Sequence, residues 1–435
     1  ALVLCSAVLF SGCIKEVLPK SGSITQEQLA ASDAGLGYMM KAIPAYMAAS
    51  SAIQYDHSDF GYHSIGVWMD HHALIAFPCV RPDRGGNPYY CRFQAANYGF
   101  DMSMNGGYTL YLWYNYYPLI KKANEVIGAA GDQEDMIEYR AISKAFRALF
   151  YLDLARYYDA LPAKAPELPT YEGDLAKVAG LTVPIVTEDT DEQAAKNNPR
   201  ATREELFEFI LADLADAEAI MKRFEKDPET GKVELEAEVY GTTPTYPELA
   251  AVYGLFARAY LWLGGFEGVS YENVPTGEAA YRLAAEYARK AINAASTTVM
   301  TEKQCLDTAT GFNNINLWMW GSQMMSEDDV VKTGIINWTS WLSNETRYGY
   351  AGIEPFNMID ASMYARISDT DFRKKLWKAP AGSALDGQTP FLAADFEKAL
   401  CTYASVKFRP AEGNADDYNV GSASAYPIMR VEEMY

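Results

Sequence analysis

The stretch from Asp135 to Pro162, DMIEYRAISKAFRALFYLDLARYYDALP, limits the possible folds more than any other part of the chain. Between Ala145 and Ala155 only two residues are charged, and apolar side chains surround the whole circumference. A helix that is apolar on all sides is buried in a large protein or in a membrane. A membrane span is excluded, because charges interrupt the stretch before it reaches the roughly 18 apolar residues required. We therefore predict a helix packed among other helices.

The polar residues of this stretch predict its ends and its internal pairing. Asp132 or Asp135 can cap the start of the helix, and the Leu161-Pro162 pair is expected to stop it. The two charged residues inside it, Arg147 and Asp153, need partners, because an unpaired buried charge is costly. We interpret both as members of structural ion pairs and not as site residues.

Further stretches have helical periodicity and suggest stacked helix pairs. Thr202 and Glu205 form the pattern of a capping box at the start of the predicted helix over 202–224. In the predicted helices over 245–263 and 278–294, small residues recur at helical spacing. This pattern resembles a tetratricopeptide (TPR) unit, which needs other units to stack on it. The predicted helices cover residues 25–51, 108–129, 202–224, 245–263 and 278–294, and the small residues are Ala250, Gly254, Ala257, Ala284, Ala288 and Ala291.

We therefore predict a mainly α fold, in which TPR-like helix pairs at about 108–295 form a scaffold for a loop-rich irregular half in a single large domain. In that irregular half, residues 316–320 alternate enough to predict a short strand. Residues 357–367 are expected to form a short helix, and residues 369–373 to cap another.

The first residues, ALVLCSAVLFSGC, indicate export. They are uncharged and apolar, as in a secretory signal, and small residues precede a cysteine as in a bacterial lipoprotein signal. We predict a signal-peptide remnant at 1–12, lipid attachment at Cys13 and a tether over 13–24; cleavage nearby without lipidation is the alternative. The chain is expected to lack its natural N-terminus, and also further C-terminal residues, because it stops inside a stretch typical of a helix start.

Charge and motif content exclude several functions. The net charge is −20, whereas nucleic-acid binding needs a basic face. No GxSxG, P-loop or HExxH motif is present, so we predict no enzyme activity and no cofactor. An exported glycoside hydrolase stays open as an alternative, because the spacing of its two carboxylates is spatial and not sequential.

The sequence contains only weak patterns for metal binding and for a disulfide bond. His57, His63, His71 and His72 match no zinc-binding spacing, and we predict no metal site there. Two acidic pairs, Asp189 with Asp191 and Asp369 with Asp371, lack the other positions of a calcium loop. Cys79 and Cys91 flank a Pro/Gly-rich loop and are a disulfide candidate, since an exported chain is in a disulfide-permissive compartment.

Several blocks together resemble the SusD/RagB family of outer-membrane nutrient-binding lipoproteins. They are the lipoprotein signal at Cys13, DFGYHSIGVWMDHHAL (59–74), YPLIKKANEVI (117–127), FRALFYLDLARYYDALP (146–162), PRATREELFEFILADLADA (199–217), the Ala-rich pair at 245–294, ASMYARISDTDFRKKLW (361–377) and the terminal PIMRVEEMY. The resemblance covers nearly the whole chain. It implies an α-helical domain over 25–435, no catalysis, capture of glycan or another oligomeric nutrient at the cell surface, and a SusC-like TonB-dependent barrel transporter as partner.

The resemblance places the ligand site in the irregular half, where two stretches combine flat aromatic rings with planar polar groups. Such groups suit a sugar, whose ring has an apolar face and whose edge carries hydroxyls. The ligand-binding candidates are Trp68, Asp70, Arg81, Tyr89 and Tyr90 in the first stretch, and Trp338, Trp341 and Tyr350 in the second; Arg84, Asn87, Asn337, Asn344, Arg347 and Tyr348 lie among them.

The resulting prediction is a lipid-anchored outer-membrane protein at the cell surface that binds oligosaccharide or polysaccharide and delivers it to the transporter. The alternative is a TPR-type adaptor, or a peptide-binding surface lipoprotein without a glycan site.

Overall fold

The computed structural model describes residues 33–48, 107–159, 178–323, 343–348, 361–423 and 425–435, with Asp328, Val331 and Ile359 as isolated positions. The signal segment, Cys13 and the tether lie outside these residues. The described chain is mainly helical, which confirms the predicted fold class.

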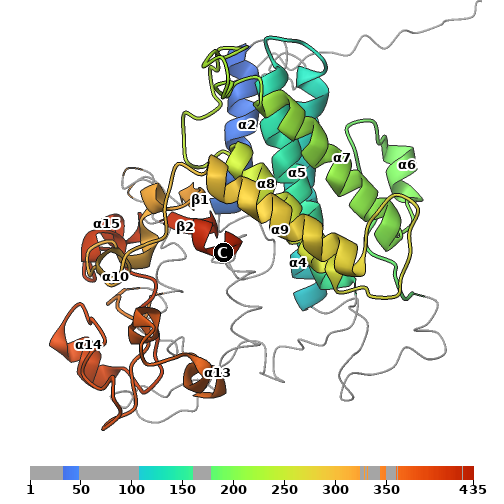
Figure 1. The fold of residues 1–435 in the computed structure, drawn as a ribbon. Helices are drawn as coiled ribbons and strands as arrows, with labels where there is room; N and C mark the ends of the chain where they lie inside the picture. Colours follow the sequence, from blue (N-terminus) through green and yellow to red (C-terminus); the bar gives the residue numbers. More distant parts are fainter. Residues whose placement is uncertain are drawn as a thin grey trace, which may run out of the picture.

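The long helices lie side by side and form one half of the molecule (Figure 1). Helix α5 lies between α4 and α7, α2 packs on α4, and α8 packs along α9 and against α7. Helices α4 and α5 are joined by a short connection, as are α8 and α9, so each pair forms a helical hairpin. The bounds are α2 (Asp33–Ala48), α4 (Gly107–Ala130), α5 (Ile137–Tyr158), α6 (Glu192–Lys196), α7 (Arg203–Met221), α8 (Leu249–Gly264) and α9 (Gly277–Ala294).

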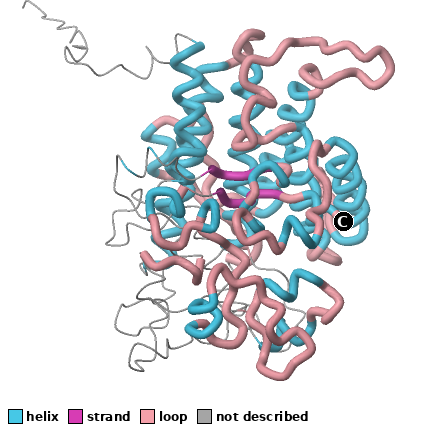
Figure 2. Tube along the Cα trace, turned by 90° about the vertical axis from the view of Figure 1, so that its left-hand side faces the viewer, coloured by secondary structure: helices cyan, strands magenta, loops and turns pink. Residues whose placement is uncertain are grey.

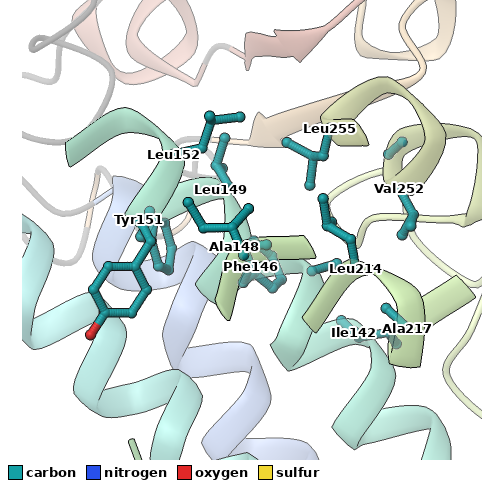
Figure 3. Close-up of a cluster of buried hydrophobic side chains, with 14 of the residues drawn as sticks. Ile142, Phe146, Ala148, Leu149, Tyr151, Leu152, Leu214, Ala217, Val252 and Leu255 are labelled. Carbon is teal, nitrogen blue, oxygen red and sulfur yellow. The ribbon is translucent and has the colours of Figure 1, made fainter. Parts of the chain in front are cut away.

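Helix α5 is the centre of the core, as the sequence predicts. Nearly every residue from Ala145 to Ala155 is buried, including side chains on opposite faces of the helix. Figure 3 shows Phe146, Leu149 and Leu152 of α5 grouped with side chains from α7 and α8. The helices that surround α5 therefore bury its apolar surface on all sides.

The predicted N-terminal cap of α5 is wrong. The residue at the N-cap position is Met136, and it makes no side-chain capping hydrogen bond. Asp132 pairs instead with Arg140, one turn inside the helix. The helix ends at Tyr158, before the predicted Leu161-Pro162 stop, which lies outside the described residues.

The start of α7 agrees with the predicted capping box. The hydroxyl of Thr202 accepts from the backbone N–H of Glu205, and the Glu205 carboxylate accepts from the Thr202 backbone. Helix α8 begins at Leu249, later than predicted, because Pro247 disfavours helical backbone at Tyr246, the residue before it.

A small antiparallel sheet joins the helical half to the loop-rich half, as Figure 2 shows. Strand β1 (Trp320–Gln323) pairs with β2 (Ala425–Met429), with an irregularity after Trp320. The strand predicted at 316–320 is therefore displaced. Residues Ile315–Leu317 form a 3-10 turn instead, whose start is capped by the Asn314 side chain.

The loop-rich half is built from short elements around separate small apolar clusters. The helix predicted at 357–367 is α13, and Asp371 caps a turn as predicted for 369–373. The elements are α10 (Glu302–Cys305), η4 (Gly311–Asn313), η5 (Ile315–Leu317), α13 (Ala361–Arg366), η7 (Phe372–Leu376), α14 (Ala394–Ala399), η8 (Ala411–Gly413), α15 (Tyr418–Ser422) and η9 (Val431–Met434).

Among the helices in the described ranges, none has both the length and the apolar content that crossing a membrane requires.

Candidate functional site

The predicted ligand residues fall in the parts of the chain that the structure does not describe. This holds for Trp68, Asp70, Arg81, Tyr89, Tyr90, Trp338, Trp341 and Tyr350, and also for Cys13, Cys79, Cys91 and the four histidines. Of the second aromatic stretch, the structure describes the segment from Ser343 to Tyr348.

Arg347 is the exposed polar group of that segment. Its guanidinium donates to Asp395 at 2.6 Å and to Asp416 at 2.9 Å, and it lies 4.6 Å from the ring centre of Phe396. Its side chain keeps 39% of its surface exposed. Hydrogen bonding to Arg347 also holds the pKa of Asp395 below its usual value. Arg347 thus ties α14 to the turn before α15 and leaves part of its surface open to a ligand.

Two tyrosines lie beside this group. The rings of Tyr348 and Tyr418 meet edge to face, with centres 6.5 Å apart. Burial raises the pKa of the Tyr348 hydroxyl, an effect that the nearby Ser422 hydroxyl partly offsets. Tyr418 is 40% exposed, two residues after Asp416. Arg347, Asp395, Asp416 and Tyr418, here called the Arg347 face, therefore present an aromatic ring next to charged hydrogen-bonding groups.

A buried ion pair fixes the segment that carries Arg347. The carboxylate of Glu345 accepts from the guanidinium of Arg409 at 2.5 Å, and both side chains are almost fully buried. Glu345 also accepts from the backbone N–H of Leu392 at 2.8 Å. Asn344 is buried too and donates to the Ser405 carbonyl at 2.8 Å. Asn344, one of the polar residues in the predicted stretch, is therefore structural.

The Arg347 face can bind a polar ligand with a flat apolar side. An exposed tyrosine ring offers area to the C–H face of a sugar, and carboxylate and guanidinium groups offer acceptors and donors to its hydroxyls. Tyr418 and Asp416 were not predicted from the sequence, since they lie about seventy residues after Arg347. The local signal was an aromatic residue next to two acids, Asp416-Asp417-Tyr418.

Arg147, a buried charge of α5, is structural, as predicted, whereas Asp153 is only partly buried. Arg147 donates to both carboxylate oxygens of Asp213, at 2.7 and 2.8 Å, and also pairs with Glu188. Burial works against its charge, but these partners outweigh that effect and raise the pKa of Arg147. Asp153 accepts from the Tyr116 hydroxyl at 3.0 Å and lies 3.8 Å from Arg156.

Three of the four acidic residues weighed as calcium ligands have other partners. Asp191 caps α6, Asp371 pairs with Arg373, and Asp369 pairs with Lys374. Over the residues that the structure describes, no group of three or more His, Cys, Asp or Glu side chains is arranged to hold a metal ion.

Comparison with known proteins identifies the fold. No protein-family model matches the chain, and neither does any curated protein. Among solved structures, a SusD-like carbohydrate-binding protein from Bacteroides vulgatus ATCC 8482 is 20% identical, with a TM-score of 0.59 over 92% of this chain and 69% of the other. A SusD superfamily protein from Bacteroides thetaiotaomicron is 16% identical, with a TM-score of 0.58 over 92% and 73%.

The chain has the SusD-like fold. Surface glycan-binding protein A from Bacteroides thetaiotaomicron, solved in complex with laminarihexaose, is also similar, with 15% identity and a TM-score of 0.53 over 92% of this chain and 77% of that one. The Arg347 face lies in the loop-rich half and includes Arg347, one of the polar residues of the second predicted stretch.

Proposed function

We propose that this chain is a cell-surface glycan-binding lipoprotein, which captures an oligosaccharide or polysaccharide and delivers it to a TonB-dependent outer-membrane transporter. The observation that carries the proposal is the SusD-like fold along 92% of the chain, shared with proteins named for carbohydrate binding. Binding is noncovalent and involves no catalysis. The acidic net charge agrees with this role and argues against nucleic acid as the ligand.

The ligand site in this proposal lies in the loop-rich half. It combines the Arg347 face with the aromatic and polar residues predicted around Trp68 and Trp338. Aromatic rings supply contact area, and planar charged or amide groups choose among hydroxyl arrangements. The buried Glu345–Arg409 pair holds one edge of the site in a fixed geometry, which lowers the entropy lost on binding.

Anchoring through Cys13 completes the proposal. Several acyl chains on one cysteine would hold the protein firmly at the membrane, since each buried CH₂ contributes about 0.8 kcal/mol. Replacing Cys13 with Ala is expected to move the protein from the membrane fraction to the soluble fraction. A variant that stays with the membrane would show that the anchor lies elsewhere.

Affinity electrophoresis tests the binding function. The folded protein is run through native gels that each contain one polysaccharide: glucans, mannans, xylans, galactans, polygalacturonate or alginate. We expect retarded migration in at least one gel and no product release from that glycan. Normal migration in every gel, together with retention on a column of immobilised peptides, would favour the peptide-binding alternative. Release of product would favour a glycoside hydrolase.

A further inference from the structure

A concave site lies where the helical half meets β2, and none of its lining residues belongs to the Arg347 face. It is a cavity of about 450 Å³, where the end of α5 and the end of α8 meet β2 and η9. Figure 1 shows β2 and the C-terminus next to these helices. The volume is within the range of about 300–1,000 Å³ that is typical of small-molecule sites.

The charged groups of this cavity balance one another. Asp153 lies 3.8 Å from Arg156, and Arg258 donates to both carboxylate oxygens of Glu433, at 2.6 and 2.7 Å. Arg258 also donates to the carbonyl of Ile428 at 2.6 Å, which fixes its position. Two carboxylates and two guanidinium groups leave no net charge. A charged ligand would add an uncompensated charge to this balanced set, whereas an uncharged ligand adds none.

Two of these groups, the exposed Arg156 and Glu433, retain capacity for hydroxyls. A carboxylate has about four acceptor positions and a guanidinium has five N–H donors, more than one ion pair uses. An uncharged ligand with many hydroxyls can therefore use donors and acceptors that stay in place when it binds.

Aromatic rings form much of the remaining wall. Tyr157 of α5, Trp262 of α8 and Tyr426 of β2 are partly exposed, whereas Tyr116 of α4 is almost fully buried, with its ring centre 6.3 Å from that of Tyr157. Rings of this kind pack well against the apolar C–H face of a pyranose. The combination of flat rings with balanced polar groups is the chemistry expected for a neutral sugar.

The rim of the cavity is accessible to solvent. Leu261 is 60% exposed, and the side chains of Arg156 and Glu433 are 52% and 41% exposed. A ligand can therefore reach the cavity along this edge, and a bulky residue at position 261 would obstruct it without disturbing the core.

We propose that this cavity is a second glycan subsite, which takes an uncharged pyranose and discriminates against uronic acids. The choice of a saccharide rests on the proposed function, whereas the preference for a neutral one follows from the balanced charges of Asp153, Arg156, Arg258 and Glu433. Two subsites on one chain would hold an extended glycan at two points and strengthen its capture by raising the effective concentration of the second contact.

The test is isothermal titration with short probes: the neutral tetrasaccharides of glucose, mannose and xylose, and trigalacturonate as the acidic probe. Leu261→Arg blocks the rim of the cavity. Val233→Arg is the matched control, because Val233 is also an exposed apolar residue, at 41%. It lies in the segment after α7, close to where residues 238–240 contact Glu138 at the start of α5, and so at the other end of that helix. Thermal melting followed by circular dichroism confirms that both variants fold.

We expect two molecules of at least one neutral tetrasaccharide to bind per wild-type chain, two per Val233→Arg chain and one per Leu261→Arg chain. Trigalacturonate should bind in the cavity at least tenfold more weakly than the neutral tetrasaccharide. Equal stoichiometry for Leu261→Arg and the wild type would overturn the subsite, as would a failure of every neutral probe to bind. If trigalacturonate binds the wild type and Leu261→Arg abolishes this binding, the preference for neutral sugars is overturned. Failure of the proposed function has a different signature, namely normal migration in every polysaccharide gel.

Discussion

Asp159 and Arg203 connect the end of helix α5 to the start of helix α7. The carboxylate of Asp159 accepts from Nε and Nη2 of Arg203, at 2.5 and 2.6 Å, and both residues are buried. The guanidinium also lies 3.6 Å from the ring centre of Phe266 and donates to the Tyr271 hydroxyl at 2.8 Å. This pair therefore fixes the relative position of two helices at the point where α5 leaves the core.

Removing Asp159 should destabilise the protein strongly. In Asp159→Ala the guanidinium of Arg203 stays buried without its carboxylate, which typically costs about 3–5 kcal/mol. The control is Glu278→Ala, which breaks the exposed pair with Arg282 and should cost at most about 0.5 kcal/mol. Guanidinium chloride unfolding measures both. Equal losses of unfolding free energy in the two variants would show that the Asp159–Arg203 pair contributes no more to stability than an exposed pair.

The core around α5 makes a second prediction. Phe146 is fully buried, with its ring centre 6.0 Å from that of Phe150 and 5.2 Å from that of Trp320 of β1. Phe146→Ala should lower the free energy of unfolding by about 3–5 kcal/mol through lost burial and a new cavity. Val233→Ala, at an exposed site, should change it by no more than about 0.5 kcal/mol. A loss under about 1 kcal/mol for Phe146→Ala would contradict the central place assigned to α5.

The capping box of α7 predicts a pH-dependent contribution to stability. Hydrogen bonds from Thr202 hold the pKa of Glu205 below its usual value. The folded state therefore favours the ionised carboxylate. Its contribution is fully present above the ordinary glutamate pKa and is lost as the pH falls through the lowered pKa of the folded state. Unfolding of the wild type and Glu205→Gln is compared from pH 7 to pH 3. The advantage of the wild type should shrink toward acid, and a constant difference would contradict the prediction.

The Arg347 face predicts a ligand-binding effect. Tyr418→Ala removes an exposed ring and should weaken binding of the retained glycan about tenfold, which corresponds to about 1.4 kcal/mol. Tyr38→Ala is the control, because Tyr38 is another exposed tyrosine, on α2 of the helical half. Titration calorimetry gives the affinities. If Tyr418→Ala binds as tightly as Tyr38→Ala, the site does not include this face.

The helical half could be predicted well, because its signals are local and periodic. The all-round apolar stretch at 145–155 has to be buried, and α5 is. Thr202 and Glu205 form the capping box that their spacing predicts. Both features depend on residues within a few turns of one helix.

The errors arise where distant residues decide the structure. Asp132 does not cap α5, because Arg140 competes for its carboxylate. Gly254 is one of the small residues that resemble a TPR unit, but a Cβ there would collide with Met429 of β2, about 175 residues later in the chain. Asp159 forms its pair with an arginine forty-four residues later. No local pattern contains these partners.

Only part of the candidate site lies in a stretch that the sequence analysis singled out. Arg347 and Tyr348 belong to a stretch singled out for aromatic and planar polar groups. Their neighbours Asp416 and Tyr418 come from α15 and the turn before it, which only the folded chain brings close. The helical cavity was missed because its lining comes from α4, α5, α8, β2 and η9, with a few residues from each.

Diffraction from crystals grown with a glycan that retards the protein in affinity gels shows whether the loop-rich half binds the glycan. We expect electron density for sugar rings in the loop-rich half, in contact with the Arg347 face or with the aromatic stretches around Trp68 and Trp338. Crystals of the folded protein that show no sugar there at saturating glycan would contradict this expectation.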